Sequence, residues 1–268
     1  MKRLLAVATM ATLCGALNCA LLPAAANAHD ADAADARGPN DTLFAAIGGG
    51  AWVHPRFPGS DSTYVQPLPY FDVRYRRLFL VSGDGLGAYL FRSHGGWAAV
   101  SVAPELRQRL QSDDDRLRGL GDVRRTARAE FQAGYAADCF TAKGDVASDI
   151  AHRGQGTIVD LSLIAHHLVF GRLQVESGVA AQWANRLFDE SFYGITAAQS
   201  TASGLPEYSA GSGLDELRVF LGANFAIDRH WLAVGRVAAV HLGRRAADSP
   251  ITERRTDAEF QLFTAYRF

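Results

Sequence analysis

The chain has 268 residues, 48% of them hydrophobic, and a formal net charge of −1 from 27 Lys and Arg against 28 Asp and Glu residues. This near-neutral balance argues against nucleic-acid binding, which relies on a strongly basic surface. Beyond the N-terminal leader, no stretch approaches the ~18 consecutive apolar residues of a transmembrane helix.

The N-terminus has the pattern of a secretory signal peptide. Met1-Lys2-Arg3 is basic, Leu4 to Leu22 is apolar, and Ala26-Asn27-Ala28 matches a small-residue cleavage site. We predict a cleaved signal peptide over residues 1–28 and a flexible periplasmic arm over 29–41, which are small and polar. Cleavage would leave Cys139 without a second cysteine, so no internal disulfide is expected.

From residue 42 to residue 268 the chain reads as short alternating segments separated by turn residues, the pattern of antiparallel strands. The first contains Gly48-Gly49-Gly50, which permits a close approach by another backbone. The last places Phe260, Leu262, Thr264, Tyr266 and Phe268 on one face, as in the closing strand of an outer-membrane barrel. Twelve strands are predicted, over residues 42–53, 70–76, 78–81, 86–91, 97–107, 126–137, 139–147, 157–169, 172–184, 214–226, 230–242 and 257–268.

The lengths of the connections sort by parity, which favours a membrane barrel over a soluble sandwich. Those after the even-numbered strands are tight, and those after the odd-numbered strands are longer, except after the third. Outer-membrane barrels have short periplasmic turns and longer outer loops. The prediction is an all-β, transmembrane, up-and-down antiparallel barrel of twelve strands in the Gram-negative outer membrane. Ten strands remain an alternative, because the segments at 78–92 are short.

The face expected to line the lumen carries charges of both signs. Neighbouring opposite charges in a narrow lumen should pair across strands, whereas an ion-selective pore favours a ring of one sign. We therefore expect a filled or narrow lumen rather than a general porin. The residues expected to form lumen ion pairs are Asp72 with Arg74, Arg128 with Glu130, Arg172 with Glu176, and Glu216 with Arg218.

The longest loop, 185–213, is dense in aromatic and small residues and is the candidate plug or partner-binding segment. Exposed aromatic side chains would be a liability, so the plug interpretation is favoured over a presented surface. The candidate residues of this loop are Phe192, Tyr193, Gly204, Pro206 and Tyr208.

Several stretches resemble the MipA/OmpV family of outer-membrane proteins, and together they span nearly the whole exported chain. The most specific is Phe192-Tyr193-Gly194-Ile195-Thr196 followed by Ser203-Gly204-Leu205-Pro206-Glu207-Tyr208. The others are Pro58-Gly59-Ser60-Asp61, Pro67-Leu68-Pro69-Tyr70, Gly119-Leu120-Gly121-Asp122-Val123, Asp248-Ser249-Pro250-Ile251 and the terminal Tyr266-Arg267-Phe268.

The resemblance implies a non-enzymatic scaffold of the cell envelope. The name-giving member of the family holds a lytic transglycosylase and a penicillin-binding synthase together, so a periplasmic murein hydrolase and synthase are expected partners, besides the lipids of the outer membrane. A narrow uptake channel and an adhesin are the alternatives. No cofactor or metal is expected, and His54, Asp61, His152, His166, His167, Ser203 and Asp248 show no recognisable catalytic spacing.

Overall fold

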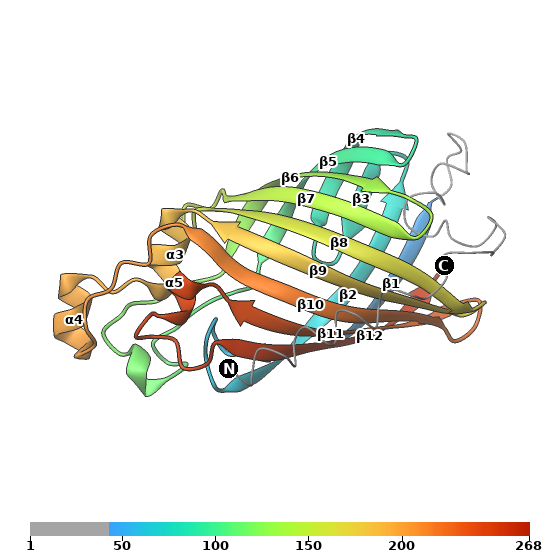
Figure 1. Ribbon diagram of the computed structural model, residues 1–268. Helices are drawn as coiled ribbons and strands as arrows, with labels where there is room; N and C mark the ends of the chain where they lie inside the picture. Colours follow the sequence, from blue (N-terminus) through green and yellow to red (C-terminus); the bar gives the residue numbers. More distant parts are fainter. Residues whose placement is uncertain (1–42) are drawn as a thin grey trace, which may run out of the picture.

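The computed structural model describes residues 43–268, which form one closed antiparallel barrel of twelve strands (Figure 1). The predicted signal peptide and arm lie outside these residues. Each strand pairs with its neighbours in the chain, and β1 closes the barrel against β12. The strands are β1 Phe44–Pro55, β2 Thr63–Tyr75, β3 Leu78–Val81, β4 Gly85–Ser93, β5 Gly96–Glu105, β6 Thr126–Ala136, β7 Phe140–Asp149, β8 Thr157–Phe170, β9 Leu173–Ala184, β10 Gly213–Ala226, β11 Trp231–Leu242 and β12 Thr256–Arg267.

The outer face of the barrel is an apolar band. Leu262 is 66% exposed, and Val219 on β10 is 60% exposed. Similar side chains recur on every second position of β8 to β10, including Leu161, Leu163, Val179, Leu217 and Leu221. So continuous an apolar surface is what a bilayer requires and what a water-soluble protein avoids. None of the helices within residues 43–268 is long and apolar enough to span a membrane.

The two ends of the barrel differ sharply. At one end the strands are joined by the short turns 76–77, 94–95, 137–139, 171–172 and 227–230, and Phe268 lies there too. At the other end the long connections 56–62, 106–125, 185–212 and 243–255 fold over the barrel mouth, and we call them the cap. This asymmetry places the turns in the periplasm and the cap outside the cell.

The cap is a packed structure with its own apolar core. Its short helices are η1 Asp115–Leu117, α3 Arg186–Tyr193, α4 Ala197–Ser203 and α5 Arg244–Ala247. Phe188, Phe192 and Tyr193 of α3 pack against Val123, Ile158, Leu242 and the α5 alanines. A second cluster joins all four cap segments through Phe57, Leu117, Leu120, Ile195 and Ile251. The sequence predicted loops rather than helices here, both over 185–213 and over the connections that contain η1 and α5.

Two predicted strand bounds were also wrong. The first strand was predicted to end at residue 53 and the second to begin at residue 70, but β1 runs to Pro55 and β2 begins at Thr63. Prolines 67 and 69 normally argue against a strand, since proline donates no ladder hydrogen bond. They are tolerated here because β3 pairs only with Asp72 to Tyr75 of β2, so the other edge of β2 has no partner strand at the two prolines.

Candidate functional site

The lumen holds a cavity of about 2410 Å³ that runs from the turn end up to the underside of the cap. Its lining reaches the turn residues Arg76, Gly95 and Gly171 and the terminal Phe268. At the other end it stops at Glu105, Arg107, Arg128 and Gln182, and no residue of α3, α4 or α5 lines it. The cavity is therefore a vestibule with a periplasmic mouth and a closed outer end.

A layer of buried charges forms the ceiling of this vestibule. Arg107 lies 3.0 Å from the Glu105 carboxylate and 4.0 Å from Asp215, and it donates to Gln182 Oε1 at 3.3 Å. Buried charges are stable only when they are paired and hydrogen-bonded, so these groups hold one another in place. On their cap side lies the Phe188 ring, whose centroid is 5.1 Å from the Arg107 guanidinium carbon. Helix α3 thus seals the barrel through a cation–π contact on the ion-pair layer.

Arg128 completes the ceiling and corrects one expected pair. Instead of Glu130, it binds Glu105 at 2.9 Å and donates to the backbone oxygens of Gln155 and Gly156. It also lies 5.5 Å from the Phe188 ring centroid. Glu130 accepts from Gln132 at 2.9 Å instead. Arg128 is at the outer end of β6, where the β7–β8 connection offers it two carbonyl acceptors.

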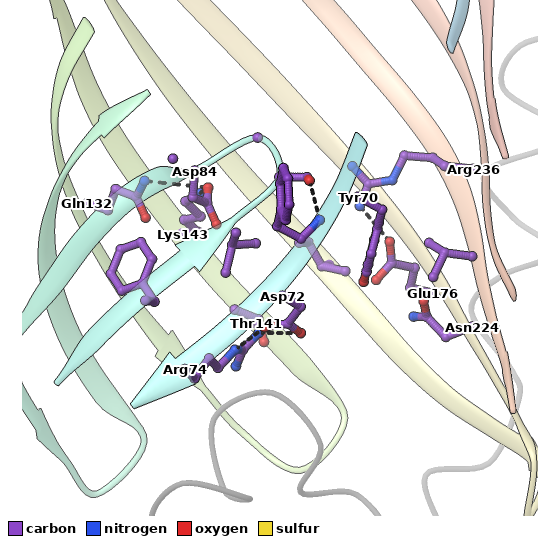
Figure 2. A pocket seen from close by; sticks show the side chains of 18 of the residues that line it. Tyr70, Asp72, Arg74, Asp84, Gln132, Thr141, Lys143, Glu176, Asn224 and Arg236 are labelled. Atoms are coloured by element: carbon purple, nitrogen blue, oxygen red, sulfur yellow. Dashed lines mark hydrogen bonds and ion pairs between the residues drawn. The ribbon is translucent and has the colours of Figure 1, made fainter. Parts of the chain in front are cut away.

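Deeper in the lumen, charges pair both within and across strands. Arg74 binds Asp72 at 2.7 Å, and Arg218 binds Glu216 at 2.9 Å as well as Asp160 of β8. The expected pair of Arg172 with Glu176 does not form. Glu176 binds Arg236 of β11 at 2.6 Å (Figure 2), while Arg172 sits in the β8–β9 turn and donates to the Ile227 carbonyl.

The β3–β4 turn bends toward the lumen and is held there. Asp84 accepts from Lys143 of β7 at 2.9 Å and from Gln132 of β6 at 3.5 Å (Figure 2). On its other flank the Ser82 amide donates to the Phe71 carbonyl of β2. This short turn was the exception to the parity rule in the sequence, and the structure explains it, because the hairpin serves as an internal brace rather than an outer loop.

Aromatic side chains that the sequence analysis did not single out line much of the vestibule. Phe79, Tyr89 and Trp97 form a chain with ring centroids 5.0 and 6.2 Å apart. On the neighbouring strands, Tyr70 of β2 lies 5.7 Å from Phe263 of β12, over the glycines of β1. Phe263 is an aromatic residue on the otherwise polar face of the closing strand. That exception was the signal in the sequence that could have indicated an aromatic lining. The lining therefore suits a ligand with both apolar and charged parts.

The five candidate residues of the 185–213 segment fall into two groups. Phe192 and Tyr193 are buried in the cap core, and Tyr208 donates from its hydroxyl to the Arg245 carbonyl at 2.7 Å. Gly204 ends α4 in the left-handed conformation, with φ of 78°, and Pro206 is exposed. The segment divides into an inward half around α3 and an exposed half around α4, none of whose residues is buried.

Two ionisable side chains of the cap core lack full hydrogen bonding. Burial, assisted by the charge of Asp215, raises the pKa of Asp189 to about 8. Its Oδ1 has no hydrogen-bond partner in the described part of the chain. Burial lowers the pKa of Arg109 to about 10, although its Nη2 donates to the Ser191 carbonyl at 3.1 Å. The raised pKa of Asp189 makes the stability of the cap depend on pH.

Comparison with known families decides the relationship. The chain matches the family described as "MltA-interacting protein MipA" over residues 47–268. It belongs to the MipA family. This match covers the barrel from within β1 onward, together with its cap, and it agrees with the motifs seen in the sequence.

Two relatives from Escherichia coli (strain K12) illustrate how far the sequence of this chain has diverged from theirs. The protein named "MltA-interacting protein" is 23% identical over 77% of this chain and 83% of its own length. The protein named "Putative outer membrane protein YiaT" is 27% identical over 48% of this chain, and the match spans about half, 51%, of its own length. The localisation of this MipA-family barrel is accordingly the outer membrane.

Solved structures similar to this MipA-family chain are outer-membrane barrels. The channel DcaP of Acinetobacter baumannii is 7% identical, covering 85% of this chain and 97% of its own, with a TM-score of 0.37. Salmonella typhi OmpF is 11% identical, covering 87% and 99% of the two chains, with a TM-score of 0.39.

Proposed function

We propose that this barrel is a non-enzymatic binding protein of the cell envelope, which holds a periplasmic partner of murein assembly at the mouth of its vestibule. The observation that carries the proposal is the one-ended cavity. A diffusion pore needs a path through both ends, whereas this lumen opens toward the periplasm and ends at the Arg107–Glu105–Arg128 layer. Such a shape suits holding a partner better than conducting a solute.

The identity of the partner rests on the family. One relative is named for interacting with MltA. We infer a murein hydrolase of that kind as the first partner, with a murein synthase as the second. The turn end is the part of the barrel that a periplasmic protein reaches, and an inserted peptide would meet the aromatic and charged side chains that line the mouth.

The side chains that could serve in hydrolysis form hydrogen bonds with other residues rather than with one another. Ser203 Oγ donates to the Gln199 carbonyl in the cap, His54 contacts Gln66, and His166 contacts Thr141 at 3.0 Å. A nucleophile, a base and an orienting acid must lie within hydrogen-bond reach of one another. Their separate engagement supports a binding role rather than catalysis.

The direct test measures binding of the purified, refolded barrel to the purified MltA-type hydrolase of the same organism. Asn224 lines the vestibule near its mouth on β10, so Asn224→Trp narrows the entrance. The matched control is Val219→Trp, which adds the same ring to the lipid face of the same strand. The proposal expects wild type and the control to bind and Asn224→Trp to bind at least tenfold more weakly.

Planar-bilayer conductance separates the alternatives. A silent wild-type protein that is shown to be folded by heat-modifiable gel mobility supports the closed vestibule. A stable open level would replace the scaffold with a narrow channel. Loss of hydrolase binding in both tryptophan variants, or in neither, would contradict a partner held at the mouth. If the hydrolase fails to bind wild type at all, the adhesin alternative, resting on the exposed α4 surface, gains ground.

A further inference from the structure

The barrel wall is incomplete on one side, in the half nearer the cap. Strand β3 has four residues and pairs only with Asp72 to Tyr75 of β2. Strand β2 nevertheless continues to Thr63, paired with β1 alone over that length. On the far side, β4 begins at Gly85, whereas β5 extends to Glu105. Between Val65–Pro69 of β2 and Ala103–Glu105 of β5, no strand of the described chain closes the wall (Figure 1).

Prolines occupy this open edge of β2. Phe71 donates its amide to Ser82 Oγ and accepts the Ser82 amide, so its polar backbone groups face the gap. Successive residues of a strand alternate in this direction, and Pro69 and Pro67 therefore face the gap as well. Because proline has no N–H, neither leaves an unpaired donor there.

The opposite edge follows the same rule. The Val102 carbonyl is turned toward Gly85 of β4, where a Cβ would collide with it. Pro104, two residues on, faces the same side beyond the end of β4. Both edges thus present carbonyl oxygens and few donors, and the Pro69 carbonyl already accepts from Ser82 Oγ at 3.2 Å. Strand addition needs donors and acceptors in alternation, so these edges are poorly suited to receiving another strand.

The gap lies at the level of the apolar band and reaches the lumen. Pro67 is opposite Ala51 of β1, which is opposite Leu262, an outward-facing residue. Leu68 and Pro69 from one edge and Pro104 and Leu106 from the other all line the vestibule. The two edges therefore belong at once to the wall that faces lipid and to the internal cavity.

A basic groove lies beyond the outer ends of β5 to β7, among the connections that follow β5 and β7. About 400 Å³ in volume, it is lined by Gln108, Leu110, Asp122, Arg124, Arg125 and Arg153. Arg124 lies 3.4 Å from Asp122, while Arg125 and Arg153 form no ion pair within residues 43–268. Unpaired guanidiniums at the outer rim of the barrel match a lipid with phosphate groups on its head.

We propose that the gap and the basic groove together form a lateral binding site for a phosphorylated, acylated glycolipid of the outer leaflet, that is, a lipid A-type molecule. One acyl chain lies between the β2 and β5 edges and reaches the vestibule. The phosphate binds Arg125 and Arg153 at the outer rim, and the head group lies there, above the edges that hold the acyl chain. The vestibule then has two entrances, a periplasmic mouth and a side door in the membrane.

Photocrosslinking in native outer membranes tests the acyl-chain part. The photoreactive residue p-benzoylphenylalanine is placed in turn at Leu68 in the gap, at Val219 on the lipid face, and at Phe220 in the lumen wall away from the gap. Adducts with lipopolysaccharide are detected by immunoblot. The proposal expects adducts at Leu68 and Val219 and none at Phe220. Adducts at Val219 without any at Leu68 would overturn it.

Variants of the groove test the phosphate part. The triple variant Arg124→Ala, Arg125→Ala and Arg153→Ala should lower the adduct yield at Leu68 about tenfold, the effect of one lost charge-assisted contact, and leave that at Val219 unchanged. The matched control removes three arginines from the turn end, Arg76→Ala, Arg77→Ala and Arg229→Ala, and should keep the wild-type yield. Native mass spectrometry with purified lipids provides a second measurement. Retention of bisphosphorylated lipid A, with weaker retention of its dephosphorylated form and of phosphatidylglycerol, supports the site. Equal retention of all three overturns it.

Discussion

Single glycines determine whether β1 can close the barrel. A Cβ at Gly48 would overlap the Thr264 carbonyl oxygen of β12, and one at Gly50 would overlap that of Leu262. Gly49, between them, has only the Leu68 carbonyl oxygen nearby, at the ordinary distance of 3.6 Å. The seam between the first and last strands therefore depends on two of the three consecutive glycines, which the sequence predicted to permit a close approach.

Gly48→Ala and Gly49→Ala form a matched pair at this seam. We expect Gly48→Ala to refold poorly and to lose heat-modifiable gel mobility, because the methyl group pushes β12 away. Gly49→Ala should migrate like wild type. Equal behaviour of the two variants would mean that the seam tolerates side chains and closes by another contact.

The raised pKa of Asp189 predicts that the stability of the cap depends on pH. In the folded cap its carboxyl keeps a proton up to about pH 8, whereas in the unfolded chain it loses that proton near pH 4. The folded cap binds more protons between these values, so its stability is greatest at the acidic end and falls as the pH rises toward 8. Charging this carboxyl would introduce an unpaired charge beside Asp215.

The expected result is more frequent channel opening at pH 9 than at pH 6 in planar bilayers. Asp189→Asn stays neutral at both pH values and should remain closed at both. Asp122→Asn, which changes an exposed cap carboxylate, is the control and should behave like wild type. A pH response that survives in Asp189→Asn would assign the effect to another group.

Among the elements, the long strands were predictable and their partners were not. Strands β8 to β10 have regular apolar alternation, and the predicted bounds lie within one residue of the observed ones. The ion pair of Glu176 with Arg236 joins residues sixty positions apart, so it depends on register across two strand pairings. The sequence offered only the local alternative, Arg172. Helix α3 was missed because its aromatic face becomes meaningful only against the closed mouth.

Pro67 and Pro69 on the gap-facing edge of β2 lead to a prediction about this strand. Pro69→Val restores an N–H that points into the gap, where no strand of the described chain accepts it. An unsatisfied buried donor costs roughly 1–3 kcal/mol, and more in lipid. We expect the urea midpoint of Pro69→Val in lipid vesicles to fall. Pro206→Val, in the exposed part of the cap, should leave it unchanged, and an unaltered Pro69→Val would show that water fills the gap.

At the scale of the whole molecule, helix α3 of the 185–213 segment closes the outer end of the barrel. Phe188 covers the Arg107 and Arg128 guanidiniums, whereas α4 buries no side chain. Replacing 186–193 by a glycine–serine linker should open a conducting path. Removing 197–203 should not, whereas the plug interpretation of the sequence expects a deletion over 196–210 to raise the conductance. Single-channel conductance of the two variants distinguishes inward sealing from outward display, and conductance in the α4 deletion would contradict this assignment.

The exposure of α4 has a consequence for recognition at the cell surface. Residues 197–203 project beyond the apolar core of the cap, and Gln199 and Ala202 anchor them to Leu120 and Gly119. An antibody or bacteriophage reaching the intact cell would contact this knob early, and substitutions at the exposed Ala197, Ala198 and Thr201 would provide escape at little structural expense. The same position is suited to insertion of a foreign epitope for display on living bacteria.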